Sequence, residues 1–108
     1  MHADAIERLR AQLGGPRDGA LLRFGLGQAL LGAGDAAAAA QAFRDALGFD
    51  PDYSAACKML GKALDAAGER AAAADAYRQG IAVAARRGDR QAEKEMRVFL
   101  RRLERAGG

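Results

Sequence analysis

The sequence contains few residues that could carry out catalysis or bind a metal. It has one histidine, His2, and one cysteine, Cys57. A cysteine becomes reactive when a nearby base or a helix N-terminus stabilises its thiolate, whereas Cys57 falls among apolar residues that are predicted to face a core. The acidic residues are dispersed along the chain, without the spacing of metal ligands. We therefore expect no catalytic, cofactor-binding or metal-binding residues, and no enzyme activity.

The cationic residues indicate binding rather than catalysis. Lys58 and Lys62 are four residues apart, so on a helix both side chains lie on one face. Residues 86–105 hold eight Arg or Lys against four acids, a pattern that fits the solvated face of a terminal helix or a surface for nucleic acid or an acidic peptide. Nucleic acid is the less favoured partner, because Phe99 is the one aromatic residue in this segment and bases would have no row of rings on which to stack.

Length and composition predict one soluble domain of the cytoplasm. A chain of 108 residues is too short for a second hydrophobic core. A single cysteine cannot form an internal disulfide, and it fits a reducing compartment. No apolar run approaches the ~20 residues that a membrane span needs, and the polar residues 1–4 contain no signal-peptide core. The expected protein is cytoplasmic and has no membrane partner.

A repeat of 34 residues organises the chain. When the sequence is shifted by 34 positions, residues 20–53 fall onto residues 54–87. Internal repetition of this length is typical of solenoid architectures. Because alanine is so frequent here, the evidence rests on the matches of leucine, glycine and aromatic residues: Leu26-Gly27 with Leu60-Gly61, Leu30 with Leu64, Gly34 with Gly68, and Phe43 with Tyr77.

Each repeat is predicted to contain two helices. Apolar residues recur at helical spacing on both sides of Gly34, which supplies a left-handed stop, and Asp35 is placed to cap the helix that follows. Asp52 or Ser54 is expected to cap the first helix of the second repeat. The same patterns outside the repeats add one helix at each end. Six helices are predicted, at residues 3–13, 19–33, 36–48, 53–67, 70–87 and 90–105.

The two copies resemble the tetratricopeptide repeat. The family signature runs through Leu-Gly, a large residue, a small residue, Ala, an aromatic residue, Ala and Pro. It is matched in the first copy by Leu26-Gly27, Leu30, Gly34, Ala39, Phe43, Ala46 and Pro51, and in the second copy by Leu60-Gly61, Leu64, Gly68, Ala73 and Tyr77. The sequence departs from the family at Arg23 and Cys57, where Trp is usual, and at Ala85, where the closing Pro would fall.

The resemblance implies an all-α fold, a short α-solenoid of two helix-turn-helix repeats. Two repeats are fewer than the three that a stable stack usually needs, so capping helices are expected at both ends. The predicted organisation is a single domain over residues 1–108. It has an N-terminal capping helix at 3–15, repeats at 20–53 and 54–87, and a C-terminal capping helix at 88–106.

The resemblance also implies a binding site. In the family, the first helices of successive repeats line a concave groove through positions two, five, nine and twelve of each repeat. These positions hold Leu21, Phe24, Gln28 and Leu31 in the first repeat, and Ala55, Lys58, Lys62 and Asp65 in the second. We predict a peptide-binding groove formed by Leu21, Phe24, Gln28, Leu31, Lys58 and Lys62. The last helix could add Lys94 and Arg101.

The predicted function is protein–protein interaction, by an adaptor or scaffold that binds a peptide segment of a partner. Lys58 and Lys62 would favour an acidic segment. Some family members hold C-terminal carboxylates with Lys and Asn at positions five and nine, and this arrangement is incomplete here because Lys62 replaces Asn. Two alternatives stay open. One is a homo-oligomer, such as a homodimer, formed through the same apolar groove, and the less favoured one is nucleic-acid binding by the basic C-terminal helix.

Overall fold

The computed structural model describes residues 2–107, which form six helices in sequence. They are α1 (His2–Arg10), α2 (Ala20–Gly32), α3 (Ala36–Phe49), α4 (Ser54–Ala66), α5 (Arg70–Arg87) and α6 (Arg90–Ala106). No residue in this part of the chain lies in a β-strand. The predicted all-α fold of six helices is confirmed, and five of the six helices begin and end within one residue of their predicted bounds.

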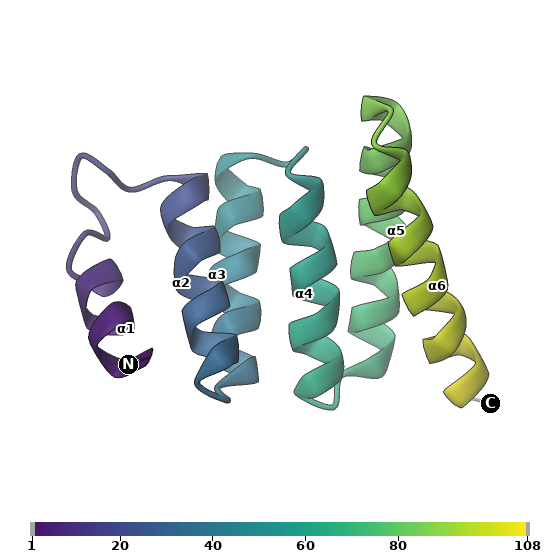
Figure 1. Ribbon diagram of the computed structural model, residues 1–108, viewed down its shortest axis with the longest axis horizontal. Coiled ribbons are helices and arrows are strands. Elements are labelled where there is room, and N and C mark those ends of the chain that lie inside the picture. Colours follow the sequence, from purple (N-terminus) through teal and green to yellow (C-terminus); the bar gives the residue numbers. More distant parts are fainter. Residues whose placement is uncertain (1, 108) are drawn as a thin grey trace.

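The helices form two layers in a molecule that measures 40 × 28 × 19 Å. Figure 1 shows α2, α4 and α6 in the nearer layer, with α3 and α5 fainter behind them. Each helix packs mainly against its neighbours in the chain, whereas α2 touches α4, and α4 touches α6, through few residues. The pairs α2–α3 and α4–α5 lie within the segments predicted as repeats, and α1 and α6 lie at the two ends (Figure 1).

The turns between helices follow the chemistry expected of glycine and aspartate. Gly34 has a φ of 88°, and the Asp35 carboxylate accepts a hydrogen bond from the backbone N–H of Ala38 at 3.2 Å. Gly88 and Asp89 repeat this arrangement before α6. The expectation of a cap by Asp52 or Ser54 is wrong, because the residue before α4 is Tyr53, whose side chain makes no capping hydrogen bond.

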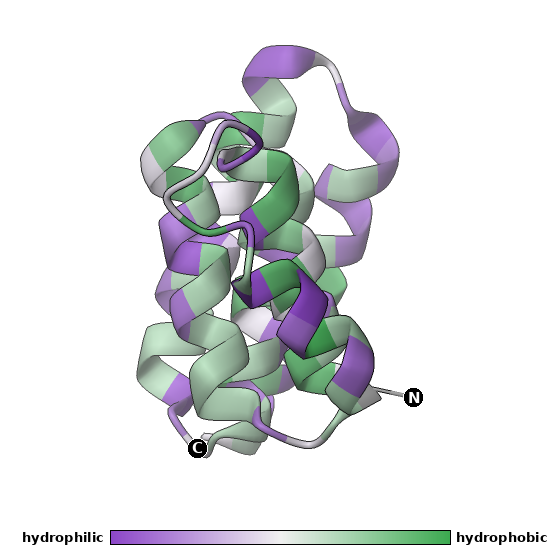
Figure 2. Cartoon of the chain, turned by 90° about the vertical axis from the view of Figure 1, so that its left-hand side faces the viewer, coloured by the Kyte–Doolittle hydropathy of each residue, from purple (hydrophilic) through white to green (hydrophobic). Residues whose placement is uncertain are grey.

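The first helix is shorter than predicted. It ends at Arg10, and the chain then tightens into turns in which the N–H of Leu13 donates to the Arg10 carbonyl at 3.1 Å. Gly14 follows with a φ of 78°, a left-handed conformation that no α-helix contains. The residue of α1 that is buried is Ile6. Figure 2 views the molecule from this end, with α1 and the loop after it toward the viewer.

A glycine beneath an aromatic ring holds the two helices of each repeat close together. Phe43 of α3 is fully buried, and its ring lies directly over Gly27 of α2, where a Cβ atom would come within 2.5 Å of the ring. Tyr77 of α5 lies over Gly61 of α4 in the same way. The small residues therefore provide room for the aromatic side chains in both repeats.

Replacing Gly27 with alanine is expected to lower the free energy of unfolding by about 1–3 kcal/mol, because the new methyl group overlaps the Phe43 ring and the core must shift. Gly25 of the same helix is a matched control, since a Cβ there would meet no atom within 4 Å. Gly25→Ala should instead raise stability by about 0.5–1 kcal/mol through helix propensity. Urea unfolding measures both, and equal effects of the two substitutions would contradict the close contact.

Removing the Phe43 ring should cost about 3–5 kcal/mol, because a fully buried aromatic side chain leaves a cavity that the helices cannot close completely. In a domain of ordinary stability that is a large share of the total. Phe49→Ala is the comparison, because Phe49 is 55% exposed, and it should change the thermal midpoint little. A midpoint that Phe43→Ala leaves unchanged would mean that this ring is not part of the core.

Candidate peptide-binding face

Four of the six predicted groove residues lie along one side of α2. Leu21, Phe24, Gln28 and Leu31 are spaced by three, four and three residues, which places them on one face of a helix. Leu21 is 77% exposed and Gln28 is also exposed, whereas Phe24 and Leu31 are half-buried. The stripe is therefore open to solvent at two positions and is partly core at the other two.

Phe24 belongs to an aromatic cluster that joins the first repeat to the second. Its ring stacks on Tyr53 with centroids 4.9 Å apart and lies tilted against Phe43 at 5.6 Å. Tyr53 immediately precedes α4, so this contact fixes where α4 begins relative to α2. Phe24 consequently supports the fold as well as forming part of the face.

The two predicted lysines lie on α4, and both contact α6. The Lys58 ammonium pairs with the Glu95 carboxylate at 3.2 Å. The Lys62 ammonium lies 5.0 Å from the centre of the Phe99 ring. The structure therefore divides the predicted site into an apolar stripe on α2 and a cationic part on α4, and α6 forms a wall beside the cationic part.

A pocket of about 470 Å³ opens where α4, α5 and α6 meet. Lys62 and Asp65 of α4 line it, as do Tyr77 of α5 and Phe99 of α6, and the remaining lining residues are Ala66, Arg70, Arg102, Leu103 and Ala106. The cation that α6 contributes to this pocket is Arg102, and Arg101 and Lys94, which were suggested for the groove, do not line it. That suggestion depended on the rotation of α6 about its own axis, which packing against α5 decides.

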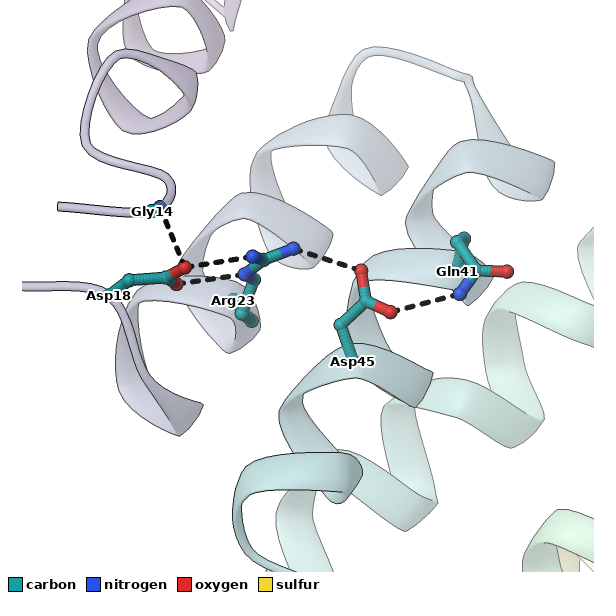
Figure 3. A network of polar contacts seen from close by, with 5 residues as sticks. All are labelled: Gly14, Asp18, Arg23, Gln41 and Asp45. Atoms are coloured by element: carbon teal, nitrogen blue, oxygen red, sulfur yellow. Dashed lines mark hydrogen bonds and ion pairs between the residues drawn. The ribbon is translucent and has the colours of Figure 1, made fainter.

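An ion network around Arg23 holds the start of α2 (Figure 3). Leu21 and Phe24 belong to the same part of α2. The Arg23 guanidinium donates two hydrogen bonds to the Asp18 carboxylate at 2.8 Å and one to Asp45 at 3.1 Å. Asp18 also accepts from the Gly14 N–H at 2.8 Å. Arg23 thus ties the loop after α1 to α3, in the position where the family usually has Trp. The sequence showed that Arg23 departs from the family pattern, but it did not predict the ion network, because Asp18 and Asp45 lie 5 and 22 residues from Arg23.

The groups that could do other chemistry are not arranged for it in the described residues. Cys57 is completely buried, and burial raises the pKa of its thiol to about 11, so the reactive thiolate is disfavoured. Residues 2–107 contain no group of three or more His, Cys, Asp or Glu side chains that could hold a metal ion. The side chain of His2 lies outside the described residues. No described helix has the length and apolar character that crossing a bilayer requires.

Comparison with known sequences decides the family. A TPR repeat-containing protein of Pseudomonas aeruginosa is 55% identical over 101 residues, which are 94% of this chain and 96% of that protein. The chain belongs to the tetratricopeptide repeat family. No family model matches the sequence. Tetratricopeptide repeat proteins are in general modules for protein–protein interaction and in general are not enzymes.

Solved structures agree with this assignment. The solution structure of a protein from Bordetella parapertussis is 48% identical and superposes with a TM-score of 0.80, over 94% of this chain and 88% of that one. Two crystal structures of MamA have TM-scores of 0.71 and 0.73 at 22% and 24% identity. The alignments with MamA cover 96% of this tetratricopeptide repeat chain, and 67% and 59% of the MamA chains. At that identity they show a shared fold.

The Asp18–Arg23 contact predicts a pH-dependent stability. The Arg23 guanidinium, helped by the Gly14 N–H, holds the pKa of the Asp18 carboxyl well below its usual range. A lowered pKa in the folded state stabilises the fold above the unfolded-state pKa of about 4, and this contribution is lost as the pH falls. Asp18→Asn should therefore lower stability at pH 7, and its difference from the wild type should shrink below pH ~4. Urea unfolding at several pH values measures this, and a difference independent of pH would contradict it.

Proposed function

We propose that this tetratricopeptide repeat protein binds a peptide segment of a partner protein on the face formed by α2 and α4. The observation that supports it best is the apolar character of α2 on two sides. Leu26 and Leu30 are buried against the other helices, while Leu21, Phe24 and Leu31 lie on the opposite stripe, with Leu21 almost bare. An exposed leucine beside the half-buried Phe24 and Leu31 leaves apolar surface in contact with water, and a partner peptide would cover it.

The cationic part of the face favours an acidic peptide. Lys62 takes part in no ion pair among residues 2–107, whereas Lys58 already shares its charge with Glu95. An exposed charge contact contributes about 1 kcal/mol or less, so we expect the apolar contacts to dominate affinity and the lysines to govern salt dependence and selectivity. This use needs no cofactor and is compatible with the cytoplasm, the expected location.

The basic helix α6 offers less to nucleic acid than its composition indicates. Arg97 pairs with Glu93 at 2.8 Å, and Arg86, at the end of α5, pairs with Asp52 at 3.1 Å. Phe99 has Lys62 and Arg102 over its ring, so the ring is not free to stack on a base. These contacts support a protein partner over nucleic acid.

The proposal is tested with peptides selected from a random library on the intact chain, with dissociation constants measured by fluorescence anisotropy. Leu21→Glu should weaken binding about tenfold or more, because it removes an exposed apolar contact and adds a charge. Lys62→Ala should weaken binding mainly at low salt. Leu21 is preferable to Phe24 as the test position, since Phe24 also packs against Phe43 and Tyr53 and its truncation would lower stability.

Phe49→Glu is the matched control, because Phe49 is also an exposed apolar residue but lies on α3, in the other layer. If Phe49→Glu weakens binding and Leu21→Glu does not, the peptide binds elsewhere and the proposal is wrong. Sedimentation at several protein concentrations tests the homodimer. A dimer that Leu21→Glu dissociates would show that a second copy covers the stripe in place of a peptide.

A further inference from the structure

The hydroxyl group of Tyr77 has no evident role in the fold. Phe43 occupies the equivalent place in the first repeat, over Gly27, without a hydroxyl. Tyr77 is only 3% exposed, and no hydrogen bond joins its hydroxyl to another residue of the described chain. No described buried side-chain oxygen lacks a partner, however, so this oxygen keeps some contact with solvent, and Tyr77 lines a pocket. A nearly buried side chain that borders a cavity thus has one polar atom without a partner in the described chain.

Cationic side chains surround the same pocket. Lys62, Arg70 and Arg102 line it against a single acid, Asp65, and none of the three cations forms an ion pair within residues 2–107. Lys62 and Arg102 both lie over the Phe99 ring, at 5.0 and 5.9 Å from its centre. The cavity of about 470 Å³ is within the size range of ligand pockets. Positive charge, an apolar wall and a hydroxyl group therefore converge on one space.

We propose that this pocket binds a side-chain carboxylate of an acidic peptide, with the Tyr77 hydroxyl donating a hydrogen bond and Lys62 and Arg102 supplying opposite charge. The inference rests on the proposed function and names the part of the face that selects the ligand. Burial, together with the charge of Asp65, raises the pKa of Tyr77 to about 12. The hydroxyl therefore keeps its proton at neutral pH and can donate it to an anion.

The lining favours a carboxylate on an aliphatic stem over other anions. Phe99, Leu103, Ala66 and Ala106 provide apolar surface around the charged groups, which suits the methylene groups of a glutamate side chain. Asp65 opposes anions, so it offsets part of the attraction that the three cations exert on the ligand. A nucleic acid would need a line of cations along its backbone and free aromatic faces, and neither is present in this pocket.

The test uses the full chain labelled with ¹⁵N and two acetylated, amidated hexapeptides of alanine and leucine, one with a central glutamate and one with glutamine in its place. NMR titrations give the dissociation constants, and we expect the glutamate peptide to bind at least about fivefold more tightly than the glutamine peptide. The largest changes in amide chemical shift should lie around Phe99 and Arg102. Tyr77→Phe should reduce affinity for the glutamate peptide about 2- to 10-fold and leave the glutamine peptide unaffected. Asp65→Asn should tighten binding of the glutamate peptide.

Arg102→Gln and Arg101→Gln form a matched pair, since both residues are exposed on α6 and Arg102 lines the pocket while Arg101 does not. We expect Arg102→Gln to abolish the preference for glutamate and Arg101→Gln to leave it intact. The proposal is overturned if the two arginine substitutions reduce the preference for glutamate equally, or if the two peptides bind with equal affinity. It is also overturned if inorganic phosphate or a single-stranded oligonucleotide causes larger changes in chemical shift than the glutamate peptide does. If Tyr77→Phe lowers the thermal midpoint, its effect on binding could come from lost stability, and the comparison of Arg102→Gln with Arg101→Gln then tests the proposal.

Leu21→Glu separates this inference from the proposed function. If Leu21→Glu weakens both peptides while Arg102→Gln weakens neither, the face binds peptides but the pocket does not select a carboxylate, and the inference is wrong while the proposed function stands. If Arg102→Gln removes the glutamate preference and Leu21→Glu has no effect, the pocket is confirmed and the α2 stripe is not part of the site.

Discussion

The distance between helices in this protein is set by contacts in which a glycine leaves room for a large side chain. Gly27 lies under Phe43, and Gly61 lies under Tyr77, within the two helix pairs. Gly80 of α5 has the same role toward α6, because a Cβ atom there would collide with the Met96 sulfur and come within 2.7 Å of the Cys57 Cβ. Since packed interiors have almost no free volume, each contact fixes one helix against the next.

These contacts have a consequence for the exposed surface. In each pair the aromatic side chain comes from the back layer, α3 or α5, and the glycine comes from the front layer, α2 or α4. The front helices therefore pack closely against the back helices without placing their own large side chains in this contact. Leu21 and Gln28 of α2 and Lys62 of α4 are left to face outward. The same geometry makes Tyr77 of the back layer a lining residue of the pocket between α4 and α6. Packing and the candidate site are therefore parts of one arrangement.

The two ends of the stack are closed by different means. At the N-terminal end, polar contacts hold the chain, with Arg23 linking Asp18 of the loop to Asp45 of α3. At the C-terminal end, α6 buries Met96 completely and Leu103 nearly so, and it reaches across to Lys58 through Glu95. A stack of two repeats needs such ends because each repeat alone leaves an apolar side uncovered. The N-terminal end adds these charge pairs to the apolar contact of Ile6, and the C-terminal end forms a wall of the candidate site.

The sequence by itself determined the number, type and placement of the helices, because helical periodicity, glycine stops and aspartate caps act over a few residues and the 34-residue repeat gives two copies of each signal. It also identified Phe43 and Tyr77 as equivalent positions of the two repeats, and both are buried in the structure. Only the tertiary structure decided how α6 is turned, that Arg102 lines the pocket between α4, α5 and α6, and that Arg23 joins two acids. The physical reason is that α5 continues to Arg87 and only Gly88 and Asp89 separate it from α6. The spacing of the repeats ends there, and the position of α6 depends on contacts such as Met96 against Gly80 that no local pattern encodes.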